Sequence, residues 1–225
     1  LSYPTTAKTL LTKYGMFDKA DYIERRTSPL KLSEGNVNYP KLGADCEANT
    51  PENSVFIVLR ESPLTNELIE QFSQRTQSTK LKLENHIDNA LPNNAWFNLL
   101  YSLPSVYKAQ VLASNYQPLW FATLANHNIP TTLTLVGPEM TAPELDDYQN
   151  LFSKSTQVSN IASLVITNSL KHLTPGLHIY YFNGDDNYQY ELFIDALLLS
   201  QRHKQDKDNI FISSIGNNDR KSGLS

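Results

Sequence analysis

Three residues with metal-ligand chemistry stand close together in the first half of the chain. Glu84, His86 and Asp88 occupy every second position, so an extended strand would present all three on the same side. Carboxylate and imidazole groups on one face can hold a divalent cation, although such a site normally needs ligands from other segments as well. The simpler interpretation of these residues is a polar strand end and turn, and we favour it over a metal site.

The remaining polar residues give weaker indications of chemistry. Asp185 and Asp186 follow an Asn-Gly pair, a composition more typical of a turn and a helix N-cap than of a cation site. Cys46 lies in a polar stretch without a neighbouring histidine, so we expect no nucleophilic role for it. Surface or hydrogen-bonded core positions are expected for the other four histidines, His127, His172, His178 and His203. The sequence has no phosphate-binding loop, dinucleotide-binding motif, nucleophile elbow or zinc-protease motif.

Composition excludes several classes of protein. The chain has 225 residues, of which 40% are apolar, enough for one large α/β domain or two small ones. Its 19 basic and 23 acidic residues give a net charge of −4, which argues against a general nucleic-acid-binding protein. A single cysteine excludes an internal disulfide framework, and neither a membrane-span pattern nor a signal-peptide pattern is present. Because the first residue is Leu1 and not methionine, we expect a processed product or part of a longer protein.

Alternating strand and helix patterns are expected to position the polar residues. Residues 1–52 predict a helical lead-in and an irregular connector, and residues 53–225 predict one α/β domain. Apolar runs or alternation predict strands at 54–59, 80–84, 132–136, 164–166, 178–182 and 210–212. Helical spacing predicts helices at 65–75, 93–101, 118–125 and 188–204. This alternation indicates a mostly parallel central sheet with helices on both faces, whose functional groups would collect beyond the carboxyl ends of the strands.

Segments spread over most of the chain resemble a known family of bacterial proteins. They are residues 3–26, 53–59, 93–104, 117–128 and 188–214. Together they resemble the sulfatase-like domain, of the alkaline phosphatase superfamily, that forms the periplasmic part of inner-membrane proteins of the YejM/PbgA type. The resemblance implies an alkaline phosphatase-like α/β fold at the periplasmic face of the bacterial inner membrane. It also implies that a segment upstream of Leu1 anchors the domain in the membrane.

The sequence departs from this family where the resemblance places catalysis. In active members an acid that holds a divalent metal ends the first strand, whereas here Arg60 stands there and Glu61 follows it. The nucleophilic Thr or Ser of the family falls at or close to Pro92, which has no hydroxyl group. The last strand of the family leads into an Asp-His pair of metal ligands, and here it leads into Ile215 and Gly216.

The resemblance and its departures therefore imply a catalytically inactive domain. We expect it to bind lipid or lipopolysaccharide headgroups, or an envelope protein, without a cofactor and without nucleic acid. A vestigial anion pocket of guanidinium and amide donors is predicted from Arg60, Asn93, Asn94, Asn217 and Asn218. One alternative is a metal-dependent phosphatase or sulfatase with displaced ligands, which would bind Mn, Mg or Zn through Glu61, Glu84, His86 and Asp88. A second alternative is an unrelated α/β interaction domain.

Overall fold

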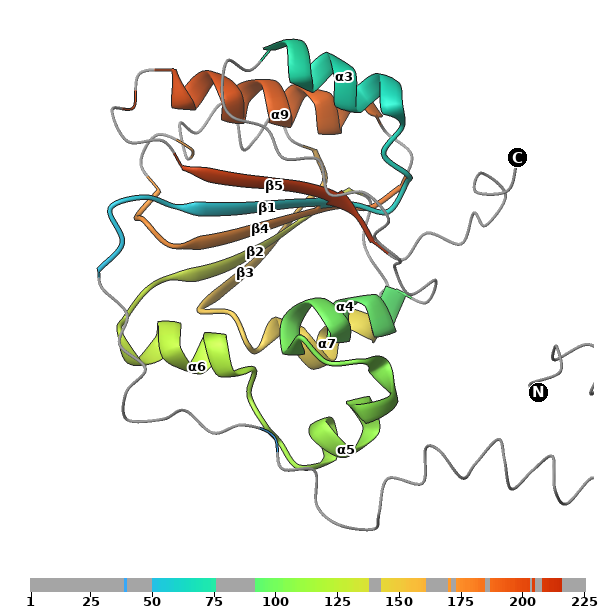
Figure 1. Cartoon of the computed structure of the whole chain (residues 1–225), viewed down its shortest axis with the longest axis vertical. Helices are drawn as coiled ribbons and strands as arrows, with labels where there is room; N and C mark the ends of the chain where they lie inside the picture. The colour runs from blue at the N-terminus through green and yellow to red at the C-terminus, as the bar shows by residue number, and fades with distance from the viewer. Residues whose placement is uncertain are drawn as a thin grey trace, which may run out of the picture. The chain divides into compact units, whose positions relative to one another are not determined.

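Five parallel strands form the central sheet of the structure (Figure 1). They are β1 (Val55–Arg60), β2 (Thr131–Val136), β3 (Lys154–Val158), β4 (Leu177–Phe182) and β5 (Asn209–Ser214). Their order across the sheet is β3-β2-β4-β1-β5, so β4 and β1 lie at the centre and β3 and β5 form the edges. Every neighbouring pair is parallel, and the register aligns Arg60 of β1 with Phe182 of β4 and Ser214 of β5.

This computed structural model describes residues 39, 50–75, 92–137, 143–160, 170, 173–184, 187–202, 204 and 208–215. All of them belong to the unit Tyr39–Ser225. The predicted helical lead-in, and the strands predicted at 80–84 and 164–166, lie outside the described residues. Within the part that is described, no helix is long and apolar enough to cross a lipid bilayer.

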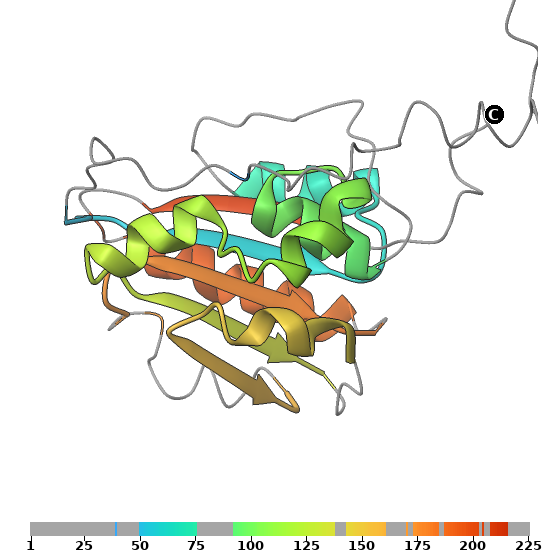
Figure 2. The same ribbon diagram turned by 90° about the horizontal axis from the view of Figure 1, so that it is seen from below.

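Helices cover both faces of the sheet. One face is covered by α3 (Asn66–Arg75) and α9 (Asn187–Gln201), as Figure 1 shows. The opposite face carries α4 (Pro92–Tyr101), α5 (Lys108–Ala113), α6 (Leu119–Asn126) and α7 (Pro143–Gln149), which lie in front of the sheet in Figure 2. A short 3-10 turn, η2 (Ser105–Tyr107), leads into α5. The predicted fold class, an α/β fold with a parallel sheet between helices, is confirmed.

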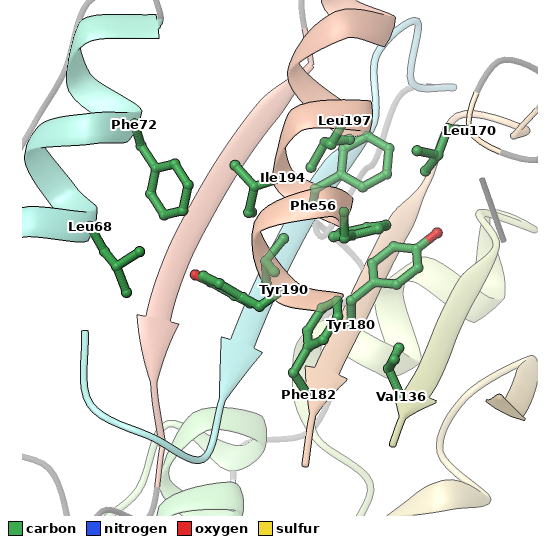
Figure 3. Close-up of a cluster of buried hydrophobic side chains, with 12 residues drawn as sticks. Phe56, Leu68, Phe72, Val136, Leu170, Tyr180, Phe182, Tyr190, Ile194 and Leu197 are labelled. Atoms are coloured by element: carbon green, nitrogen blue, oxygen red, sulfur yellow. The ribbon is translucent and has the colours of Figure 1, made fainter. Parts of the chain in front are cut away.

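Burial on both faces explains why the central strands are apolar throughout. All six residues of β4 are buried, as expected for a strand covered by helices above and below. Successive side chains point to opposite faces, so Phe56 and Val58 of β1 join the cluster under α9 (Figure 3). In this cluster the rings of Tyr180 and Phe193 lie 4.4 Å apart between centroids. Each such side chain contributes about 1.5–3 kcal/mol by its burial, and this packing fixes α9 over the ends of β1 and β4.

Most predicted elements that fall on described residues are confirmed, and the misses have a common cause. The sequence predicted β1, β2, β4 and β5, together with α3, α4, α6 and α9, with small differences at their ends. It missed β3, whose sequence Lys-Ser-Thr-Gln-Val is polar and mostly exposed because β3 is an edge strand. It also missed the short helices α5 and α7, since six or seven residues are too few to establish a helical period.

Candidate functional site

A pocket of about 530 Å³ opens beyond the carboxyl end of β1. Its walls come from the last residue of β1, the β1–α3 loop, the first half of α3 and the first turns of α9. The lining residues are Arg60, Ser62, Pro63, Thr65, Glu67, Leu68, Gln71, Asn187 and Glu191. The pocket therefore lies where open parallel sheets usually carry their ligands, on the face that α3 and α9 cover.

Arg60 forms the buried end of this pocket. It shares the side of β1 with Phe56 and Val58, because side chains in a strand alternate with a period of two, and only 4% of it is exposed. Its Nη2 donates a hydrogen bond of 2.5 Å to Oδ1 of Asn187, and its Cζ lies 4.9 Å from the centre of the Tyr190 ring. Helix α9 thus holds the guanidinium through one polar contact and one aromatic contact.

The rest of the Arg60 guanidinium is buried without a partner. Nε and Nη1 are inaccessible to solvent and make no hydrogen bond in the described part of the chain. A buried cation normally needs an anion or a full set of acceptors to offset the loss of its hydration. The hydroxyl of Tyr190 is also buried without a partner and points toward Leu68 and Phe72 in Figure 3. Burial raises the pKa of Tyr190, and the neighbouring Arg60 opposes that shift, so Tyr190 stays neutral at physiological pH.

Glu61 has a structural contact next to the pocket. Its side chain is exposed, and its Oε2 accepts a hydrogen bond of 3.0 Å from the backbone N–H of Gly184. The hydroxyl of Ser62 donates to the carbonyl of the same Gly184, at 3.3 Å. These contacts join the loop after β1 to the loop after β4. Gly184 has a φ of +86°, a conformation that favours glycine.

The other positions singled out by the resemblance are also structural where they are described. Ile215 is 4% exposed, and its N–H donates to the carbonyl of Arg60 at 2.9 Å, which continues the β1–β5 ladder. Pro92 is the first residue of α4, a position that suits proline because no helical N–H is needed there.

The described members of the predicted anion pocket do not line one cavity. Asn93 and Asn94 lie on α4, on the face of the sheet opposite to Arg60 (Figures 1 and 2). Oδ1 of Asn93 accepts a hydrogen bond of 3.2 Å from the hydroxyl of Tyr148 on α7. The structure therefore brings Arg60 to α3 and α9 instead of to α4.

The remaining predicted site residues lie outside the described residues. They are Glu84, His86, Asp88, Gly216, Asn217 and Asn218. Among the residues that the structure does describe, no three or more His, Cys, Asp or Glu side chains gather in a way that could hold a metal ion.

Sequence reasoning missed the partners of Arg60 on α9. Asn187, Tyr190 and Glu191 are 127 or more positions away along the chain, and nothing in their local pattern marks them as a site. The face of Arg60 was nevertheless readable, because the alternation that buries Phe56 and Val58 on the side of α9 also places Arg60 there.

A second polar cluster lies at the other end of the sheet and is structural. Asp208 is buried, and its carboxylate accepts hydrogen bonds from the Ser54 N–H at 2.8 Å, from Gln201 at 2.8 Å and from Lys204 at 2.6 Å. Burial alone would raise the pKa of Asp208, but these donors outweigh it and lower the pKa. The cluster fastens the starts of β1 and β5 to the end of α9.

The described histidines fit the expectation of surface or satisfied core positions. His178 is 1% exposed. Its Nδ1 lies 2.9 Å from Oγ1 of Thr132 and its Nε2 lies 3.1 Å from the carbonyl of Thr174. Burial lowers the pKa of His178, and the contact with Thr174 offsets part of this shift. His127 is exposed at the end of α6, with Nδ1 2.9 Å from the carbonyl of Thr123.

Comparison with known proteins gives one informative relative. No family model matches the sequence. An uncharacterised protein of Haemophilus influenzae is 28% identical to this chain over 134 residues. The aligned region is 57% of this chain and 23% of the relative, so the chain spans less than a quarter of the length of the protein it matches.

Proposed function

We propose that this chain is a non-catalytic, sulfatase-like domain at the periplasmic face of a bacterial inner membrane. In this proposal it acts by binding the headgroups of lipid or lipopolysaccharide, and an envelope protein is the other class of partner to be tested. The α/β fold is compatible with the resemblance, and the Haemophilus relative is bacterial and much longer than this chain. A longer protein of that kind would have room for a membrane anchor.

The observation that carries the proposal is the buried cation of Arg60. In the family that the sequence resembles, the end of the first strand supplies a carboxylate to a divalent metal. Two unit charges about 4 Å apart interact by about 4 kcal/mol at an effective dielectric constant of about 20, so Arg60 would oppose a divalent ion at that distance by about 8 kcal/mol. Tyr190 and Asn187 hold the guanidinium, which argues against its swinging away to admit a metal.

Two further positions support a non-catalytic role. Ile215 serves the β1–β5 ladder at the place where the resemblance expects metal ligands. Pro92 opens α4 at the place of the nucleophile and offers no hydroxyl for covalent phosphoryl or sulfuryl transfer. Acting together, these replacements remove both the charge stabilisation and the nucleophile that such chemistry requires.

Ester turnover tests the proposal. The purified chain is incubated with 4-nitrophenyl phosphate and 4-nitrophenyl sulfate, each with Mn²⁺, Mg²⁺ or Zn²⁺, beside an active phosphatase as positive control. We expect turnover indistinguishable from the buffer blank with every metal. Metal-dependent turnover that a Glu61→Gln variant abolishes would contradict the proposal and favour the hydrolase with displaced ligands.

The binding role is tested with vesicles. Sedimentation is compared for vesicles of phosphatidylethanolamine and phosphatidylglycerol, with and without added lipopolysaccharide. We expect the chain to sediment with at least one of these vesicles. Absence of sedimentation with all of them would reject lipid binding and leave an envelope protein as the partner class.

A further inference from the structure

We propose that the pocket beside Arg60 binds a zwitterionic group, in which an anionic phosphate or carboxylate is joined to an ammonium. This inference rests on the proposed binding role and specifies its ligand. The anionic end would contact Arg60 at the inner end of the pocket, and the ammonium would lie near the carboxylates of Glu67 and Glu191. All three residues line the pocket.

Arg60 is prepared to receive the anionic end. Nε and Nη1 are buried and make no hydrogen bond within the described residues, whereas Nη2 is held by Asn187 and the guanidinium lies over Tyr190. A guanidinium presents its donors in a fixed fork that matches two oxygens of a phosphate or carboxylate. Because one side of the fork is already fixed, little side-chain freedom remains to be lost when an anion binds.

The lining charges select against a simple anion. Arg60 contributes +1, and Glu67 and Glu191 contribute −1 each, so the described lining carries 1 − 2 = −1. A phosphate dianion would be attracted by Arg60 but repelled by the two carboxylates. An ammonium joined to the anionic group would convert that repulsion into attraction. A zwitterion therefore fits the lining better than phosphate or a simple amine does.

Glu67 and Glu191 stand where an ammonium can reach them. Glu67, in the first turn of α3, is exposed. Glu191 is half-buried and lies one turn along α9 from Asn187, the residue that holds Arg60. The pocket volume of about 530 Å³ is within the usual range for small-molecule sites and exceeds what a bare phosphate would fill.

Titration calorimetry on the purified chain tests the charge requirement. The soluble probes are O-phosphoethanolamine, glycerophosphoethanolamine, inorganic phosphate and ethanolamine. We expect both zwitterions to bind at least about tenfold more tightly than phosphate or ethanolamine. Failure of both zwitterions to bind, or equal affinity for inorganic phosphate, would overturn the inference.

Vesicles distinguish the two sources of such a group. If the ligand is a lipid headgroup, phosphatidylethanolamine vesicles sediment the chain and glycerophosphoethanolamine competes with them. If it is a free metabolite, the soluble zwitterions bind and the vesicles do not sediment the chain. Both results support the pocket chemistry; vesicle binding that the soluble zwitterions do not reduce would contradict it.

Matched variants assign the binding to the pocket. Arg60→Met should weaken binding of the zwitterions at least about tenfold, as expected for loss of a charged hydrogen-bond donor. The double variant Glu67→Gln/Glu191→Gln should lose the preference for zwitterions over phosphate. Glu70→Gln is the control, because Glu70 is exposed on α3 and does not line the pocket, and it should bind like the unmodified chain.

These outcomes separate the inference from the proposed function. Unchanged affinity in Arg60→Met, or an unchanged preference in the double variant, would overturn the inference. If Arg60→Met does not fold, the double variant and the probe series still decide. Ester turnover would instead reject the non-catalytic role, whatever the calorimetry shows.

Discussion

Replacing Arg60 by methionine should leave the fold intact and make it equally stable or more stable. Methionine is an unbranched, flexible side chain of similar reach, so it can occupy the space between β1 and α9 without a charge. Arg60 is 4% exposed, and a buried charge replaced by a well-packed apolar residue often gains about 1–4 kcal/mol. This expectation is the opposite of the usual loss on changing a buried residue.

The magnitude follows from the contacts of Arg60. Its contact with Tyr190 is worth about 0.5–2 kcal/mol, and its charged hydrogen bond to Asn187 about 1.5–3 kcal/mol. Against these stand several kcal/mol for desolvating the guanidinium and about 1–3 kcal/mol for each unpaired buried donor group. Asn187 is exposed, so it can bond to water when Arg60 is removed. We therefore expect a gain of about 0–3 kcal/mol.

Urea denaturation, followed by far-UV circular dichroism, measures the change. A gain of 2 kcal/mol would raise the urea midpoint by about 1 M if the slope is about 2 kcal/mol/M. Phe193→Ala is the control for the same helix, and it should lose about 3–5 kcal/mol because Phe193 is fully buried. A loss above about 2 kcal/mol in Arg60→Met would show that Arg60 is a structural residue, and the argument that its charge serves a ligand would fail.

Three further predictions concern the framework around the pocket. Because burial lowers the pKa of His178 below 6.5, the unfolded chain takes up the proton first as the pH falls, so stability should decrease from pH 7.5 to 5.5; His178→Gln should flatten that decrease in the urea midpoint. Asp208→Ala should cost about 3 kcal/mol in urea unfolding because it leaves the buried Ser54 N–H without its acceptor, and a cost below about 1 kcal/mol would show that the cluster is unimportant. Gly176→Ala should cost about 3 kcal/mol or more, since a Cβ there would lie 2.4 Å from the carbonyl oxygen of Pro130, whereas Gly184→Ala, with open space around a φ of +86°, should cost about 1 kcal/mol; equal losses would contradict this reasoning.

The central part of the fold was predictable because burial leaves a strong record in the sequence. Strands β1 and β4 are apolar along their whole length, since helices cover both of their faces. Edge strand β3 left no such record because its side chains face water. The strand order β3-β2-β4-β1-β5 was not predictable, since the local pattern does not say which strands become neighbours.

The site was predictable only in part, for a related reason. The sequence marked Arg60 as unusual, because it places a cation at the end of a buried strand where the resembled family has an acid. It did not identify Asn187 and Tyr190, which reach Arg60 only through the packing of α9 on the sheet. Asn93 and Asn94 were grouped with Arg60 by their place in the resembled family, but α4 lies on the opposite face of the sheet.

Crystals of the chain soaked with MnCl₂ and O-phosphoethanolamine test most directly whether Arg60 has replaced a metal site. Anomalous scattering locates manganese independently of the phosphate density. We expect phosphate oxygens within hydrogen-bonding distance of Nε and Nη1 of Arg60, and no manganese peak at the carboxyl end of β1. A manganese ion bound by Glu61, with the phosphate on the metal instead of on Arg60, would contradict the account.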